Sequence, residues 1–297
     1  MNNPEKENKR QTIYESINDL WRDIFDYKET GKLDEYIDFI TRIPSHAPFN
    51  NTLVFLQNPK CGYYETKRRW KNIFEREVKR DASPMLILKP FGPVDLVYDL
   101  SDIEGPKIAP EELLYWWLQK GGFSEERFEH TMKNLKKEYD INVIFSSPEE
   151  YFRKSYNGGN FRTAGYAVKH SNRGKDIIFH PRYKREAYTS ELYSVFCHEI
   201  AHHLLGHLGD IFVQKKTKKG KLESPVIKVK SRRDIGENLM ELEAELASWI
   251  VLRMLGIEAE KSVKYMASWL RDKKDVREVN LSEVLKVAGK IKKMGES

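Results

Sequence analysis

The sequence predicts an α+β protein of two domains, a small N-terminal α+β domain and a mainly helical C-terminal domain with a short sheet. Three observations support this prediction, the first being that 297 residues, 40% of them hydrophobic, suit two modest cores better than one large core. Residues 101–110 combine a glycine, two prolines and acidic side chains, as a linker does. Short β-rich runs occur in both halves, whereas long helical periodicity dominates the second. We therefore expect domains at residues 11–104 and 110–297.

The elements expected in the N-terminal domain are three helices and a β-hairpin. Apolar side chains spaced three and four residues apart predict the helices, and two β-rich runs around a Phe-Gly-Pro turn predict the paired strands. The helices are expected at residues 12–27, 33–40 and 51–57, and the strands at 85–90 and 94–99. Residues 1–10 are hydrophilic and predict a disordered lead.

The C-terminal domain is expected to hold six helices and three strands. The helices are expected at residues 111–120, 124–139, 189–207, 234–255, 259–271 and 281–293, and the strands at 141–145, 163–170 and 175–180. Ser124, followed by two glutamates, is typical of a helix N-cap. Residues 214–233 carry nine lysines and arginines against one glutamate, which is typical of a solvated mobile loop.

Composition narrows the class of protein. No run of about 18 apolar residues is present, and the N-terminus lacks the apolar stretch of a signal peptide, so we expect a cytoplasmic protein with no membrane partner. The two cysteines, Cys61 and Cys197, argue against a disulfide framework. A formal net charge of +6 and a pI near 9.0 are compatible with an anionic partner.

The stretch CHEIAHHLLGH, residues 197–207, carries the strongest chemical signal. His198, Glu199 and His202 form an H-E-x-x-H motif in apolar, helical surroundings. Residues four apart lie about 40° apart around a helix, so both imidazoles can bind one ion. A catalytic zinc takes three protein ligands and a water, and the glutamate can take a proton from that water and return it to a leaving amine. The motif therefore predicts a zinc metallopeptidase with Glu199 as a catalytic residue and a protein as its substrate.

His207 is the nearer of two candidates for the third metal ligand. It is the tenth residue counted from His198, whereas a three-histidine pattern needs a histidine at the eleventh. A continued helix would also place it about 180° from His198. We therefore reject His207 as a ligand.

The helix expected at 234–255 offers the other candidate. Glu241 and Glu245 are four apart on a face that also carries Ser248. Glu241 would bind the metal, and Glu245 would accept the second N–H of a ligating histidine and so fix its tautomer. Glu245 and Glu237 remain alternatives as the ligand, while Glu243 fits an ordinary surface charge.

Peptide hydrolysis also needs a donor for the developing oxyanion, opposite the water. Tyr166, His170 and Tyr183 are candidates that the sequence does not separate, and we take Tyr166 as the working assignment of a second catalytic residue. His203 falls on a different helical face, so we expect it at the surface or behind a ligand. We expect Cys197 to be a small buried side chain.

The segment of residues 60–89 suggests a nucleic-acid partner. It carries nine basic and four acidic side chains, a net charge of +5, with aromatic residues interleaved. Cations that neutralise phosphates beside aromatic faces suit single-stranded DNA, because every base can stack on a ring. The candidate binding residues are Tyr63, Tyr64, Lys67, Arg68, Arg69, Trp70 and Lys71. A basic surface over a core made of the same aromatic rings would give an identical pattern.

Five longer segments extend these motifs. They are FNNTLVFLQNP, YYETKRRW and DASPMLILKPFGPVDLVYD in the N-terminal half, and VFCHEIAHHLLGHLG and ELEAELASWIVLRMLGI in the C-terminal half. Together they resemble the ArdC-type antirestriction proteins, a group related to the ImmA/IrrE metallopeptidases, over most of residues 40–260. The resemblance implies a single-stranded-DNA-binding N-terminal domain and a gluzincin-like metallopeptidase domain whose E-x-x-A-[DE] motif matches Glu241 and Glu245. The basic insertion at 214–233 is longer than that pattern implies.

Three functions are compatible with these features. The leading hypothesis is a zinc-dependent metallo-endopeptidase that docks on single-stranded DNA and cleaves a bound protein. The rival is a non-proteolytic, antirestriction-like factor that shields DNA or inhibits a nuclease. Glu199 counts against the rival, because a structural zinc has four closed ligands and no use for that carboxylate. The third is a peptidase that cleaves a transcriptional repressor.

Overall fold

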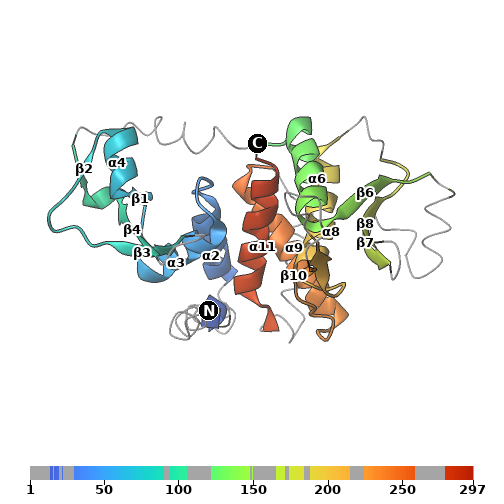
Figure 1. Cartoon of the computed structure of the whole chain (residues 1–297). Coiled ribbons are helices and arrows are strands. Elements are labelled where there is room, and N and C mark those ends of the chain that lie inside the picture. The colour runs from blue at the N-terminus through green and yellow to red at the C-terminus, as the bar shows by residue number, and fades with distance from the viewer. Residues whose placement is uncertain are drawn as a thin grey trace. The chain divides into compact units, whose positions relative to one another are not determined.

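The computed structural model divides into two compact units, Met1–Gly121 and Gly122–Ser297 (Figure 1). It describes residues 30–89, 94–105, 122–147, 165–170, 174–183, 188–214, 224–257 and 278–296, together with residues 14, 15, 17–19, 22 and 149. The helices expected at 111–120 and 259–271, and most of the one expected at 12–27, lie outside the described residues. The division at Gly121 falls beyond the expected linker, because Gly122 already donates its N–H to the carbonyl of Leu255.

Two helices open the described part of the N-terminal unit. In α2 (Thr30–Thr41), Tyr36, Ile37 and Ile40 are buried, which is the stripe predicted from their spacing. α3 (Pro48–Gln57) begins three residues before the expected position, since proline is well suited to the first helical turn. The rings of Tyr36 and Phe55 meet edge to face at 5.3 Å, so the two helices share an aromatic core.

The predicted β-hairpin is present in this unit. β3 (Met85–Leu88) and β4 (Val94–Asp99) pair antiparallel, and β1 (Tyr64–Thr66) pairs with the other side of β4 to give the order β1-β4-β3. β2 (Glu77–Val78) and β5 (Ile103–Glu104) form a separate two-stranded ribbon, which the 3₁₀ turn η1 (Leu100–Asp102) leads into. Residues 100–104 are therefore structured, and the linker expected to begin at residue 101 is wrong over this part.

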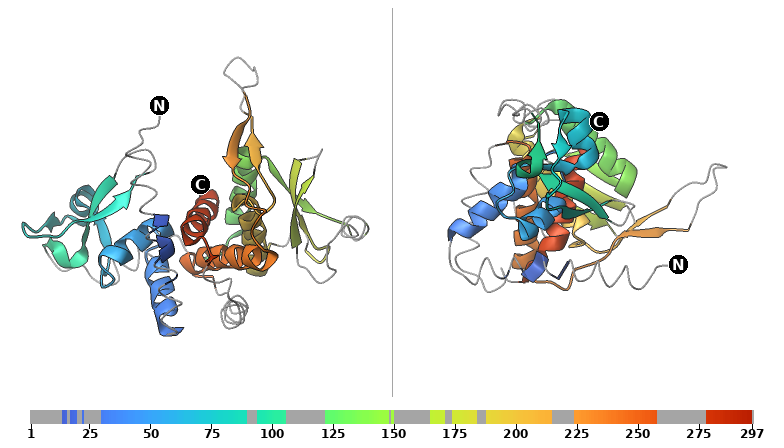
Figure 2. Two further views of the ribbon diagram at one scale, coloured as in Figure 1. Left: turned by 90° about the horizontal axis from the view of Figure 1, so that it is seen from below. Right: turned by 90° about the vertical axis from the view of Figure 1, so that its left-hand side faces the viewer.

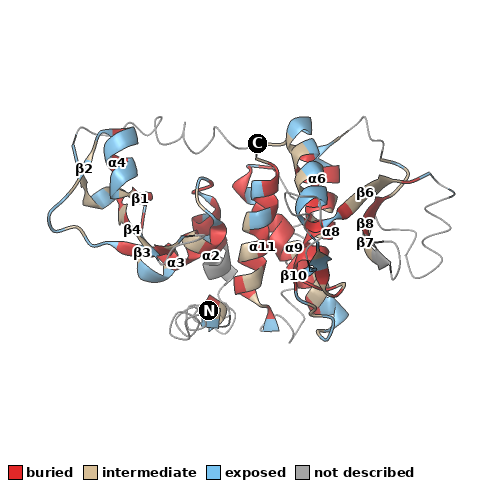
Figure 3. Ribbon diagram, in the orientation of Figure 1, coloured by how far each residue is buried: buried red, intermediate tan, exposed pale blue. Residues whose placement is uncertain are grey.

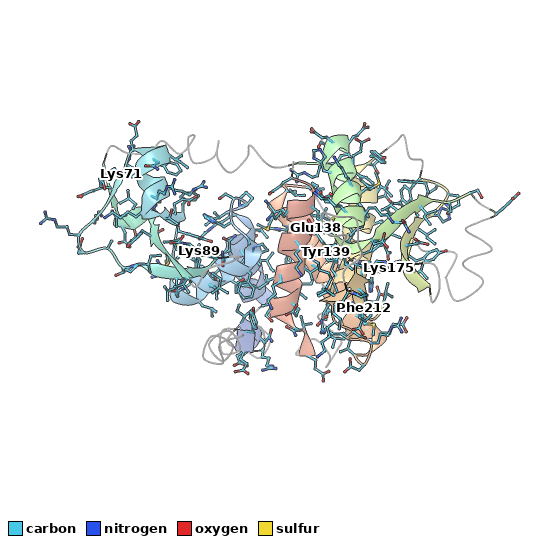
Figure 4. All side chains as sticks on the ribbon, viewed as in Figure 1. Lys71, Lys89, Glu138, Tyr139, Lys175 and Phe212 are labelled. Carbon is cyan, nitrogen blue, oxygen red and sulfur yellow. The ribbon has the colours of Figure 1, made fainter. Side chains whose placement is uncertain are left out.

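Helix α4 (Lys67–Phe74), between β1 and β2, was missed by sequence reasoning. The side chain of Thr66 caps it by accepting a hydrogen bond from the N–H of Arg69 at 3.3 Å. Trp70 and Phe74 are its buried residues, and they anchor it to the unit. Its cationic side chains face outward, as Lys71 does in Figure 4.

The outer edge of β3 is covered by two amide side chains of α3. Asn50 donates to the carbonyl of Leu88 and accepts from its N–H, both at 3.1 Å. Gln57, two turns later, does the same for Leu86 at 2.9 and 2.8 Å. Because an uncovered strand edge invites pairing with other chains, these amides act as a substitute for a fourth strand.

The C-terminal unit combines a small mixed sheet with four described helices. Its elements are α6 (Glu125–Tyr139), β6 (Ile141–Phe145), β7 (Gly165–His170), β8 (Gly174–Phe179), α8 (Ser190–Leu204), β9 (Ile211–Val213), β10 (Val226–Val229), α9 (Glu237–Met254) and α11 (Leu281–Met294). Ser124 caps α6 as predicted, accepting from the N–H of Arg127 at 3.1 Å. The sheet order is β6-β8-β7, with β6 parallel and β7 antiparallel to β8. The fold of the chain is thus α+β, as expected.

Helix α8 lies at the centre of this unit, between the sheet and α9 (Figure 1). The ring of Phe196 stacks on Phe128 of α6 at 4.8 Å and meets Phe179 of β8 edge to face at 5.7 Å. Much of α8 and α9 is buried in Figure 3. The histidine-bearing helix is therefore held by packing on both sides.

The chain leaves α8 earlier than expected. The helix ends at Leu204 rather than residue 207, because Gly206 adopts a φ of +80° that turns the backbone. β9, which contacts α6, then pairs antiparallel with β10 (Figure 2), so the loop expected at 214–233 is wrong at Val226–Val229. Lys175 lies beside this ribbon, with its ammonium 3.5 Å from the carbonyl oxygen of Phe212 (Figure 4).

No helix among these described residues combines the length and the apolar character needed to cross a bilayer.

Candidate metal centre

Three predicted ligand side chains converge in the C-terminal unit. Nε2 of His198 and Nε2 of His202 lie 3.1 Å apart on α8. The carboxylate of Glu241, from α9, lies 3.3 Å from the first nitrogen and 3.4 Å from the second. One ligand atom from each residue can be chosen so that all three lie within 4.8 Å of one another. The structure brings the three predicted ligands together, and neither Glu237 nor Glu245 joins this group. That these residues bind a metal stays a prediction.

The register between α8 and α9 explains why Glu241 arrives at this point. Ser248, seven residues after Glu241, donates a hydrogen bond from its hydroxyl to the carbonyl of Ser194 at 3.1 Å. Ser194 precedes His198 by one turn, so the two helices run past each other with their polar positions aligned. Leu242 and Leu246, both buried, pack α9 into the core beside them.

The donor set suits a divalent first-row ion. Two imidazole nitrogens and one carboxylate oxygen are the ligands of a catalytic zinc site, which keeps a further position for water. The side chain of Glu241 is 36% exposed, whereas those of His198 and His202 are 18% and 11% exposed. The cluster is thus partly open to solvent on the carboxylate side.

The carboxylates around His198 favour a positive charge there. Burial acts to lower the pKa of His198, but hydrogen bonds with Glu241 and Glu245 outweigh it and raise the pKa to about 10. Burial acts to raise the pKa of Glu241, and hydrogen bonds with His198 and His202 hold it far below its ordinary value. A bound cation would satisfy the same electrostatic demand as a proton.

Glu245 occupies the place expected of a supporting residue. Its Oε2 lies 3.1 Å from Nδ1 of His198, on the side of the ring away from the shared point. A carboxylate at Nδ1 keeps the proton on that nitrogen and leaves the lone pair of Nε2 directed at the ligand cluster.

Glu199 lies beside the ligands and is 8% exposed. Burial is the main cause that raises its pKa to about 7; His198 acts to lower it, Glu241 to raise it, and a hydrogen bond from the backbone N–H of Ala167 to lower it. The contact with Ala167 ties the carboxylate to β7. A carboxyl group with a pKa near neutrality is suited to take up and release a proton.

Two residues of this region have roles that the sequence did not indicate. Glu243, expected at the surface, is fully buried and accepts a hydrogen bond from Nε2 of His207 at 3.2 Å. Nδ1 of His207 lies 3.1 Å from Nδ1 of His202, behind the ligand cluster. Glu243 is four residues after Leu239 and three before Leu246, so its place on the apolar stripe of α9 was the available signal.

The oxyanion donor stays a prediction. Tyr166 lies on β7, where a Cβ on its neighbour Gly165 would sit 3.1 Å from Val195 of α8. Side chains alternate along a strand, so Tyr166 belongs to the opposite face of the sheet. The hydroxyl of Tyr183 is close to Glu191 at 3.4 Å, and His170 is the last residue of β7.

His203, expected at the surface or behind a ligand, is buried against the carbonyl of Asp176.

The stacking platform expected in the N-terminal unit is wrong. Tyr63, Tyr64 and Trp70 are 2%, 0% and 0% exposed, so none of these rings can receive a base. Each polar atom is also engaged within the unit, Tyr63 with Glu65 at 3.0 Å and Trp70 with the carbonyl of Tyr98 at 3.0 Å. The segment is therefore a basic surface over an aromatic core, the alternative that its composition left open.

The predicted cationic residues do lie at the surface. Lys67, Arg68, Arg69 and Lys71 are all exposed on α4. Arg69 bonds the buried carboxylate of Glu65 at 2.9 Å, and Lys71 pairs with Glu77 at 2.9 Å. The structure thus leaves phosphate contacts, rather than base stacking, as what this surface could offer a nucleic acid.

Comparisons with known proteins identify no family for the chain. No protein-family model matches it, and no curated protein does. Among solved structures it is similar to the antirestriction ArdC protein from the R388 plasmid in its Mn(II)-bound form. That likeness covers 96% of this chain and 98% of the other at 16% identity and a TM-score of 0.36. A TM-score and an identity this low carry no argument about function.

Proposed function

We propose that the chain is a zinc-dependent metallo-endopeptidase whose ion is held by His198, His202 and Glu241. The observation that carries the proposal is the convergence of these three donors beside the buried carboxylate of Glu199. Three protein ligands leave a position for water, which a purely structural zinc site does not. A zinc ion bound here would lower the pKa of that water and polarise the carbonyl under attack.

Glu199 then carries both proton transfers, and Ala167 and Glu245 hold the reacting groups in place. Glu199 takes the proton of the attacking water as the oxygen bonds to the carbonyl carbon, and it returns that proton to the amine nitrogen as the C–N bond breaks. The N–H of Ala167 keeps the Glu199 carboxylate in place through the transfer. Glu245 holds the ring of His198 in the tautomer that binds metal.

An extended peptide is the substrate class that fits the surroundings. β7 is the outer strand of the described sheet β6-β8-β7, and its Ala167 reaches Glu199. A peptide lying along an outer strand can pair with its backbone, which places a carbonyl carbon near the base without demanding a particular side chain.

The test compares the wild-type chain with Glu199→Gln on a mixture of unfolded proteins, reading new N-termini by mass spectrometry. The amide cannot accept the water proton, so we expect cleavage to fall by at least about 100-fold while metal content stays the same. Glu237→Gln, at the exposed start of α9, is the control and should cleave normally. Equal cleavage by wild type and Glu199→Gln would rule out the proposed mechanism.

The exposed cations of α4 favour a second candidate function, an antirestriction-like factor that binds single-stranded DNA without proteolysis. Lys67, Arg68 and Lys71 would contact phosphates, so affinity should fall as salt rises. Changing all three to glutamine should reduce the slope of log affinity against log salt. A nuclease-protection assay separates the two functions, since protection retained in Glu199→Gln favours shielding and protection lost with it favours proteolysis.

A further inference from the structure

A hydrogen-bonded series of ionisable groups, with His207 and Glu243 buried at its centre, lies behind the metal centre. His207 is 3% exposed and Glu243 is 0% exposed. Nδ1 of His202 lies 3.1 Å from Nδ1 of His207, whose Nε2 lies 3.2 Å from Oε2 of Glu243. Arg232 donates to both oxygens of Glu243 at 2.7 and 2.8 Å, and the backbone N–H of Asn280 donates at 2.8 Å.

The hydrogen bonds among these four side chains fix where each proton lies when the site holds a metal. His202 presents Nε2 to the ligand cluster, so its own proton must sit on Nδ1. That N–H can donate only if Nδ1 of His207 accepts, which puts the proton of His207 on Nε2. From there it is donated to Glu243, whose charge Arg232 and Asn280 hold in place.

The turn at Gly206 places His207 beside Nδ1 of His202, which it could not reach if α8 continued. At φ +80° it ends α8 and folds the chain back, so the N–H of His207 bonds the carbonyl of His202 at 3.1 Å. In the same turn, the carbonyl of Gly206 accepts a hydrogen bond from the N–H of Arg232 at 2.9 Å. A Cβ on Gly206 would lie 2.1 Å from the carbonyl oxygen of Lys230, so only glycine fits here.

We propose that His207 is a positioning residue for the metal ligand His202, held in its accepting tautomer by Glu243 and Arg232. The inference rests on the metal centre of the proposed function. It gives the two ligating histidines different supports: His198 is held by a carboxylate directly, and His202 by a carboxylate acting through a second, neutral imidazole. Residues that orient metal ligands in this way typically contribute about 10–100-fold to metal affinity.

The test measures the Zn²⁺ dissociation constant by chelator competition for three variants. His207→Ala removes the acceptor and should weaken binding by about 10–100-fold. His207→Asn keeps an oxygen near the place of Nδ1 and should recover part of that loss. His203→Ala is the matched control, because His203 is a buried histidine next to His202 on α8 that contacts the carbonyl of Asp176 rather than the ligands, and it should bind zinc as the wild type does.

Each outcome decides the inference. Equal zinc affinity in His207→Ala and wild type would overturn it, as would an equal loss in His203→Ala, which would mean that any cavity near His202 weakens the site. A wild-type chain that binds no zinc refutes the proposed function together with the inference. Should His207→Ala fail to fold, ¹⁵N NMR of the zinc-loaded wild type decides: a proton on Nε2 of His207 supports the inference, and a proton on its Nδ1 contradicts it.

Discussion

Nδ1 of His198 and Oε2 of Glu245 lie 3.1 Å apart. Glu241, one helical turn earlier on α9, faces Nε2 of the same ring. Glu245→Ala should therefore weaken zinc binding by about 10–100-fold, because the ring of His198 loses its orientation. Glu245→Gln keeps an acceptor oxygen and should lose less. Glu237→Ala, on the exposed first turn of α9, serves as the control in the same chelator competition. Equal affinity in all four proteins would show that the contact has no part in metal binding.

Removing the metal should lower the melting temperature of the C-terminal unit. An ion that binds only the folded state stabilises it by about 4.1 kcal/mol when free ion is about 1,000 times the dissociation constant. A chelator should abolish this stabilisation in the wild type. Added Zn²⁺ should not raise the melting temperature of Glu241→Ala. Calorimetry with and without added Zn²⁺ measures the effect. A melting temperature that does not respond to zinc in the wild type would contradict the expectation.

The N-terminal unit should lose stability in acid through Asp99. Burial acts to raise the pKa of Asp99, but hydrogen bonds from Ser101, Cys61 and the N–H of Gly62 outweigh it and hold the pKa below its ordinary 3.8. A lowered pKa in the folded state gives stability that is complete above about pH 4 and is lost as pH falls through the folded value.

Asp99→Asn should therefore be less stable than wild type at neutral pH, and the difference should shrink below about pH 4. Urea unfolding at a series of pH values measures this. Asp95→Asn, on the same strand and ion-paired with Lys89, is the control for charge alone. A difference between wild type and Asp99→Asn that is constant with pH would show that the pKa of Asp99 is the same in both states.

The pairing of Gln57 with the edge of β3 should also be measurable. Gln57→Ala removes two hydrogen bonds to the backbone of Leu86 and should cost about 1 kcal/mol, since the exposed backbone groups can still bond water. The variant should self-associate more readily at high concentration, because a strand edge is uncovered. Asn72→Ala, an exposed amide on α4, should do neither. Sedimentation and chemical denaturation check both effects.

The convergence of His198, His202 and Glu241 could be predicted in part, because the spacing of the candidate ligands within each helix is local. The spacing of His198 and His202, and of Glu241 and Glu245, is one helical turn in each case, so the periodicity of a helix fixes which side chains share a face. The hairpin of β3 and β4 could also be predicted, because its turn residues and β-rich runs are adjacent in sequence.

Features that depend on tertiary burial could not be read from composition. Tyr63, Tyr64 and Trp70 lie among cations in the sequence, and only the packing of α4 against the sheet decides that they face inward. Glu243 is charged and was therefore expected at the surface, yet Arg232 and His207 satisfy it inside the core. The end of α8 depended on one positive φ, which spacing does not reveal.

Elemental analysis of the purified chain tests the central claim most directly. We expect about one equivalent of zinc, or of another divalent ion, per wild-type chain. His198→Ala and Glu241→Ala should each lose most of it and His203→Ala should keep it. A wild-type chain without a bound ion, or variants that retain it in full, would contradict the account.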